Sequence, residues 1–302
     1  MSDKFPRRIN KILLPKETVK LLVQNLPEFI AVDNGLKKMA KLEIPLLEIN
    51  AGSLDFLDGK KMFFRILNIH SENCIIISKD SMMLDEFEAI TRSKGNLDAS
   101  GITSRYGRIL GYPECCVENF SKNFRGFNPD IIRNMKNSSE RCSFLLNNFF
   151  PMSLISHYPC NYFCSPSLSY AKNLLDLMKS ENSLFLQYIL WGLKLPMIVF
   201  DEKNLIFFEG ELDGNLIGYS RVLSSEDLYK MFLDLINVPF EDISLEGLAG
   251  QGTALWNDRI LVPELKKGNK LRLTGNTLEI YLDSMLVRKL YLKEIPVLLS
   301  FT

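Results

Sequence analysis

Residues 108–120 read RILGYPECCVENF, and residues 156–171 read SHYPCNYFCSPSLSYA. The chain has six cysteines, and four of them stand in these two stretches. Apolar residues recur at three- and four-residue spacing here and in the surrounding segment, from about residue 81 to residue 191, which is typical of helices. Both cysteine pairs are therefore predicted to lie in a helical middle part of the chain.

The first pair lies at the start of a predicted helix, residues 113–124. Successive helical residues are about 100° apart, so Val117 and Phe120 mark the apolar side of this helix. Cys116 falls near that side, whereas Cys115 points mostly away from it. Both thiols lie in the first turn, where free backbone N–H groups and the helix dipole favour thiolate over thiol. We therefore expect two neighbouring thiolates with different roles.

The second pair precedes another predicted helix. Cys160 and Cys164 are four residues apart, Ser165 is a suitable N-cap, and Pro166 suits a first turn. Two helix starts that face each other would form a small electropositive pocket for a metal ion, an iron–sulfur cluster or a reactive thiolate. His157, one of only two histidines, is a candidate fourth ligand or proton shuttle.

The spacing of the cysteines favours an iron–sulfur cluster. Neither CC nor CxxxC is a zinc knuckle, and adjacent cysteines do not easily bind one tetrahedral ion together. Cys116, Cys160 and Cys164 are expected to bind the cofactor, with Cys115 as a fourth ligand or as a reactive thiolate. Zinc, no metal at all, or burial of the cysteines as small apolar residues are the alternatives.

A resemblance to a known family rests on the same two stretches. They resemble the paired signature GRxLGYPxCCVxxF and HxPCxxxCxxSxxxA of an uncharacterised prokaryotic family, domain of unknown function 483. Asn161 stands where that family usually has a serine. The resemblance supports the site and implies no reaction. The motif positions that it implies are Gly111, Tyr112, Pro113, Cys115, Cys116, His157, Pro159, Cys160, Cys164 and Ser167.

The flanking segments predict a mixed α/β (α+β) protein. We expect a small α/β unit at residues 1–95, the helical cysteine-bearing segment at residues 96–195, and a mainly antiparallel β region with one helix at residues 196–302. The expected helices are 17–26, 35–43, 82–95, 99–111, 113–124, 129–150, 165–192 and 224–237. The expected strands are 28–33, 44–50, 62–69, 73–80, 196–212, 215–223, 270–274, 277–282, 286–292 and 296–301.

The composition excludes several classes of protein. Lysine plus arginine equals aspartate plus glutamate, 36 against 36, so no global field attracts nucleic acid or an acidic membrane surface. No secretory signal and no membrane-spanning run is evident, so a cytoplasmic location is expected. The expected partner is a small-molecule substrate or a redox protein. The oligomeric state does not follow from the sequence.

Other residues are weaker candidates. Arg105 and Arg108 are three residues apart on one predicted helix face, where they are candidate ligands for a substrate carboxylate or phosphate. Cys74 and Cys142 stand alone among apolar residues and are expected to be packing residues, and His70 is expected at the surface. The glycine-rich residues 247–256 lack a phosphate-binding spacing and are expected to form a loop.

Three functional hypotheses follow. The first is an enzyme of redox or sulfur-transfer chemistry with a cysteine-ligated metal centre, in which Cys115 and His157 are catalytic. The second is a metal-free dithiol oxidoreductase, in which Cys115 and Cys116 react with Cys160 or Cys164. The third is a binding protein in which zinc only staples the helical segment.

Overall fold

The computed structural model describes residues 16–43, 54–69, 72–92, 99–123, 129–139, 141–179, 183–200, 204–235, 261–293 and 295–302. The strand expected at residues 44–50, His70 and the glycine-rich residues 247–256 lie outside these ranges. In the described part of the chain, no helix has the length and apolar character that are needed to cross a bilayer.

The N-terminal unit is a three-stranded antiparallel sheet covered by helices on both faces. Its strands pair in the order β1-β3-β2. They are β1 (Met39–Glu43), β2 (Phe63–Ile69) and β3 (Glu72–Ser78). Helices α1 (Lys16–Asp33) and α2 (Asp55–Gly59) cover one face, and α3 (Ser81–Arg92) and α4 (Ala99–Ile109) cover the other. Ile75 and Ile77 of β3 face α1, whereas Cys74 and Ile76 face α3, so β3 is buried on both sides.

The predictions for residues 28–33 and 35–43 were wrong. Residues 28–33 are the last third of α1 and not a strand, because this helix lies between two apolar clusters. Ile30 and Ala31 pack into the large apolar cluster around α7, the central cluster, whereas Phe29 and Val32 pack against β1 and β3. Because both sides of the helix are buried here, the sequence shows a continuous apolar run and not the three- and four-residue spacing of a one-sided helix. Residues 39–43 are β1 and not a helix, because pairing with β3 overrides their helix propensity.

The middle of the chain is helical, with one long irregular segment. Its elements are α5 (Glu114–Asn123), α6 (Pro129–Asn137), the 3-10 turn η2 (Phe144–Leu146), α7 (Ser165–Lys179) and α8 (Ser183–Gly192). The helix predicted for residues 129–150 therefore ends early. Beyond α6, the Asn147 side chain forms hydrogen bonds with the backbone in place of helical backbone hydrogen bonds. It donates to Leu193 O at 2.9 Å and accepts from Phe149 N–H at 3.1 Å.

The C-terminal part forms an antiparallel sheet, as predicted, with seven strands in the order β10-β4-β5-β6-β7-β8-β9. The single strand expected at residues 196–212 was wrong, because it is two strands, β4 and β5, that pair with each other antiparallel. Its strands are β4 (Met197–Val199), β5 (Leu205–Asp213), β6 (Leu216–Ser224), β7 (Lys270–Thr274), β8 (Thr277–Leu282), β9 (Met285–Tyr291) and β10 (Val297–Leu299). Gly214, with φ +59°, makes the predicted turn between β5 and β6. Helices α9 (Ser225–Leu235) and α11 (Val262–Leu265) pack on β6.

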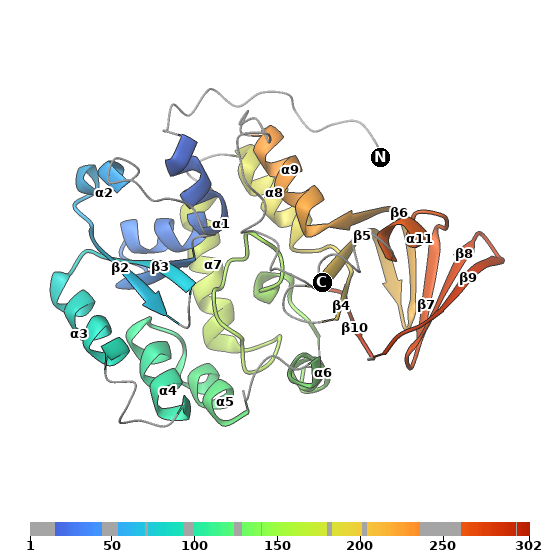
Figure 1. Ribbon diagram of the computed structural model, residues 1–302, viewed down its shortest axis with the longest axis horizontal. Coiled ribbons are helices and arrows are strands. Elements are labelled where there is room, and N and C mark those ends of the chain that lie inside the picture. The colour runs from blue at the N-terminus through green and yellow to red at the C-terminus, as the bar shows by residue number, and fades with distance from the viewer. Residues whose placement is uncertain are drawn as a thin grey trace.

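Helix α7 occupies the middle of the molecule, with the N-terminal sheet on one side and the C-terminal sheet on the other (Figure 1). The largest apolar cluster surrounds it and combines residues of α1, α7, α8, α9, β4, β5 and β10. The start of α7 and the irregular segment before it are therefore held from several directions. This is the region that carries the second cysteine pair.

Candidate metal centre

The structure brings the four motif cysteines together. The sulfurs of Cys115, Cys116, Cys160 and Cys164 all lie within 4.8 Å of one another. Cys115 Sγ is 3.9 Å from Cys116 Sγ and 3.7 Å from Cys164 Sγ, and the Cys116–Cys164 separation is 3.6 Å. We call these four residues the sulfur cluster. All four are free thiols, and the cluster is a set of donor atoms that can bind a metal.

The Gly-Tyr-Pro sequence at residues 111–113 positions the first cysteine pair, Cys115 and Cys116. Helix α4 ends in a Schellman motif, in which Tyr112 N–H donates to Gly107 O and Gly111 N–H donates to Arg108 O. Gly111 has φ +75°, a left-handed conformation that favours glycine. Pro113 follows, and its carbonyl accepts the N–H of Val117 at the start of α5. The two helices are thus joined by a tight corner that fixes the position of the first turn of α5.

The two neighbouring cysteines face different environments, as the sequence predicted. Cys116 is 1% exposed and packs in the central cluster, whereas Cys115 is exposed. Pro113 lies one position before the helix, so the cysteines are its second and third residues. Cys115 therefore forms the open side of the sulfur cluster and Cys116 its buried side.

A tight turn at Asn161 positions the second cysteine pair, Cys160 and Cys164. Asn161 accepts the N–H of Phe163 on its side chain and the N–H of Cys164 on its carbonyl, and its amide donates to Cys160 Sγ at 3.6 Å. The N-cap of α7 is Cys164 and not Ser165 as predicted, because the Cys164 carbonyl accepts the N–H of Leu168. Asn161 thereby sets the distance between Cys160 and Cys164.

Ser167 connects the sulfurs to His157. The Ser167 hydroxyl lies 3.3 Å from Cys116 Sγ, 3.4 Å from Cys164 Sγ and 2.9 Å from His157 Nε2. Ser167 is fully buried and His157 nearly so. Burial first, and the charge of Lys37 second, lower the pKa of His157 to about 3, so its ring is neutral. His157 is thus placed behind Ser167, and the donor cluster consists of sulfurs.

Hydrogen bonds concentrate negative charge on Cys164. The Cys116 thiol, the Ser167 hydroxyl and the Ser167 N–H bond to its sulfur and lower the pKa of Cys164 to about 4. Burial and the neighbouring sulfurs raise the pKa of Cys160 to about 12. The pKa of Cys116 is raised as well, by its bond to Cys164 and by burial. A nearby cation is therefore needed to hold Cys116 and Cys160 as thiolates.

A buried polar network behind His157 was missed by the sequence reasoning. Lys37 forms an ion pair with Glu28, and both side chains are nearly inaccessible. Lys37 Nζ also donates to Ser156 Oγ at 3.3 Å and lies 4.7 Å from the centre of the Tyr112 ring. That ring lies 5.0 Å from the His157 ring. Helix α1 and the turn after it thereby contact the segment that carries the second pair.

The two candidate arginines lie at the surface. Arg108 forms a two-pronged ion pair with Glu114 across the α4–α5 corner: Nη2 donates to Oε1 at 2.5 Å and Nε donates to Oε2 at 3.1 Å. Both side chains are about half exposed. Arg105 is exposed. Among the described residues, no hydrogen bond joins either guanidinium to a cluster sulfur. A role for them in substrate binding remains a prediction.

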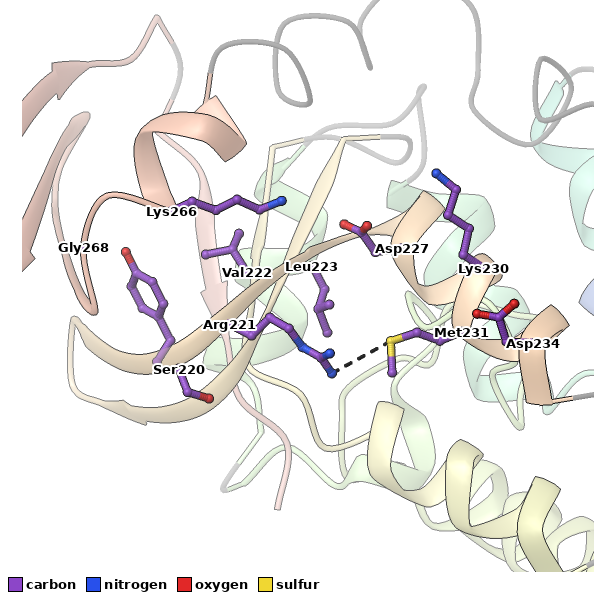
Figure 2. A pocket seen from close by; sticks show the side chains of 11 residues that line it. Ser220, Arg221, Val222, Leu223, Asp227, Lys230, Met231, Asp234, Lys266 and Gly268 are labelled. Atoms are coloured by element: carbon purple, nitrogen blue, oxygen red, sulfur yellow. Dashed lines mark hydrogen bonds between the residues drawn. The ribbon is translucent and has the colours of Figure 1, made fainter. Parts of the chain in front are cut away.

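A cavity of about 380 Å³ lies elsewhere, beside β6 and α9. Among the described residues, its lining includes none of the four cluster cysteines. Figure 2 shows Arg221, which reaches Met231 Sδ at 3.9 Å, together with Asp227, Lys230 and Lys266. Arg221 is paired with Glu209. The cavity is therefore separate from the sulfur cluster.

Comparison with known protein families gives one match, in the middle of the chain. Residues 72–184 match the family described as "Protein of unknown function (DUF483)". No curated protein and no solved structure matches the chain significantly. The matched residues include all four cysteines of the sulfur cluster, His157 and Ser167. The part of the chain that forms the sulfur cluster is therefore similar to the uncharacterised DUF483 family.

Proposed function

We propose that the sulfur cluster binds a single metal ion, zinc or iron, through four thiolates. The separation of the sulfurs carries this proposal. A tetrahedral ion with metal–sulfur bonds of about 2.3 Å holds its sulfurs about 3.8 Å apart. The three separations of 3.6, 3.7 and 3.9 Å lie close to that value.

The hydrogen bonds around the sulfurs support this proposal. Cys160 N–H donates to Cys116 Sγ at 3.3 Å, and Ser167 and Asn161 donate to the other buried and half-buried sulfurs. Donors of this kind stabilise the negative charge of metal-bound thiolates and fix their orientation. A thiolate only accepts, so Ser167 gives its one hydroxyl proton to a sulfur, and the His157 tautomer in this state carries its proton on Nε2.

An iron–sulfur cluster on the same cysteines is the alternative that the sequence favours. In a four-iron cluster each thiolate binds a different iron atom, so the sulfurs stand farther apart than on one ion. The short separations of the sulfurs therefore favour the single ion. A closed structural zinc is a second alternative, but the exposure of Cys115 supports a centre that an external molecule can reach.

We further propose an enzyme that acts on a small substrate at Cys115. A bound ion would hold the sulfurs as thiolates at neutral pH and so supply a nucleophile. Ser167 and His157 would keep the buried sulfurs oriented, and the half-buried Cys160 would flank the open side. Redox or sulfur-transfer chemistry, predicted from the sequence, is compatible with these roles.

The first test is the metal and acid-labile sulfide content of protein purified without oxygen. We expect one zinc or iron ion per chain without sulfide, and loss of that ion in Cys164→Ser. Cys142→Ser is the matched control, because Cys142 is a half-buried thiol outside the sulfur cluster.

Other results would overturn this assignment. Several iron atoms with equimolar sulfide would show a cluster in place of the single ion. Protein without metal, in which oxidation links two of the four thiols, would identify a dithiol enzyme.

A further inference from the structure

We propose that Cys115 is the one sulfur of the centre that accepts an alkyl group from an uncharged or cationic donor, while the other three cysteines retain the ion. This inference rests on the proposed single-ion centre. It concerns a division of labour among the four ligands, which differ in exposure, in hydrogen bonding and in their place on the helices.

The first observation is exposure. Cys115 is exposed and Cys160 half-buried, whereas Cys116 and Cys164 are 1% and 4% exposed. An electrophile that approaches from solvent therefore meets Cys115 Sγ first. Cys116 and Cys164 are shielded by the central apolar cluster into which they pack.

The second observation is hydrogen bonding. The sulfurs of Cys116, Cys160 and Cys164 each accept from a backbone N–H, a hydroxyl or a side-chain amide. Among the described residues, the contacts of Cys115 Sγ are with other sulfurs. A hydrogen bond stabilises a thiolate and weakens it as a nucleophile. Cys115 thus keeps the most reactive electron pair of the four.

The third observation is charge. Four thiolates and one dipositive ion leave two negative charges at the centre. Next to Cys115, the Glu114 carboxylate is neutralised by Arg108, so this pair adds no further net charge. An anionic donor is repelled by such a centre, and an uncharged or cationic donor is not.

The reaction is a simple displacement. Cys115 Sγ forms a bond to the alkyl carbon, the bond from that carbon to its leaving group breaks, and the leaving group departs with the electron pair. The sulfur changes from a thiolate to a neutral thioether, so no proton, oxidant or reductant is required. Three thiolates remain to hold the ion.

Iodoacetamide, an uncharged alkylating reagent, provides the test on the zinc-loaded full chain. Adducts are mapped by mass spectrometry over time, and bound zinc is measured in the same samples. We expect Cys115 to be modified at least 10-fold faster than the other three cluster cysteines, with zinc retained after the first adduct. Iodoacetate, which is anionic, should react at least fivefold more slowly than iodoacetamide relative to their rates with a free thiol.

Two variants sharpen the result. Cys115→Ser should abolish the fast phase, and Cys142→Ser, which removes a half-buried thiol outside the sulfur cluster, should keep it. A loaded protein whose first adduct lies on Cys160, or whose four cysteines react at equal rates, overturns this inference and leaves the metal centre intact. A protein that binds no zinc or iron overturns the metal centre and this inference together.

Discussion

Replacing Ser167 with alanine tests how strongly the hydrogen bonds behind the sulfurs support the metal centre. The change removes a hydroxyl that lies 3.3 and 3.4 Å from two sulfurs and 2.9 Å from His157 Nε2. It adds no atom, and alanine is the best helix former, so α7 itself should be preserved. The effect therefore reports the lost hydrogen bonds.

The magnitude follows from the partners that are lost. Removing a group that hydrogen-bonds metal ligands typically lowers metal affinity 10- to 100-fold, which corresponds to about 1.4–2.8 kcal/mol. The His157 donor is left buried without its partner, which costs about 1–3 kcal/mol of folding free energy even without metal. We therefore expect weaker metal binding in Ser167→Ala and a less stable metal-free protein.

Two measurements separate these effects. Competition with a chromophoric chelator gives the metal affinity, and urea unfolding of the metal-free protein gives the free energy of unfolding. The control is Ser169→Ala, an exposed serine on the same helix, for which we expect a change within about 0.5 kcal/mol. A Ser167→Ala protein with an affinity within threefold of the wild type would refute the supporting role of this hydroxyl.

Three further predictions concern the surroundings of the site. Lys37→Met leaves Glu28 buried without its partner and should lower the free energy of unfolding in urea by about 3–5 kcal/mol. Adding Glu28→Gln should restore part of that stability. A double variant no more stable than Lys37→Met would argue against the ion pair as the cause. The folded-state pKa of His157 is lowered, so metal-free protein should lose stability as the pH falls from about 6.5 toward 3, at no more than about 1.4 kcal/mol per pH unit for this group, and His157→Gln should remove that component of the slope. Gly111→Ala, at φ +75°, should destabilise the protein by about 1–2 kcal/mol, whereas Gly59→Ala, which meets open space, should be near neutral in thermal unfolding.

The sequence allowed the prediction of features that depend on local patterns. Alternating strands and turn glycines predicted the C-terminal antiparallel sheet, and helical geometry placed Cys116 inside and Cys115 outside. The proximity of the two pairs could be expected only because both lie at helix starts. The separations between the sulfurs depend on the turn at Asn161 and on the α4–α5 corner, which no residue pattern specifies.

Features that depend on distant contacts could not be predicted. The strand prediction for residues 28–33 failed because two separate clusters bury adjacent residues of α1. Glu28 and Lys37 carry no motif, and their pairing is visible only once α1 has packed beside the segment around Ser156. Ser167 was a motif position by resemblance, but its contact with both buried sulfurs required the fold.

The shared burial of α1 has a consequence for cooperativity. One face of this helix belongs to the cluster around the sulfurs and the other to the cluster beneath β1 and β3, so neither cluster can open without exposing the same helix. Ligand binding to the folded state stabilises every region that unfolds together with the site. Metal binding should therefore slow amide hydrogen exchange in β3, although Ile75 and Ile77 belong to a cluster that contains none of the four sulfurs.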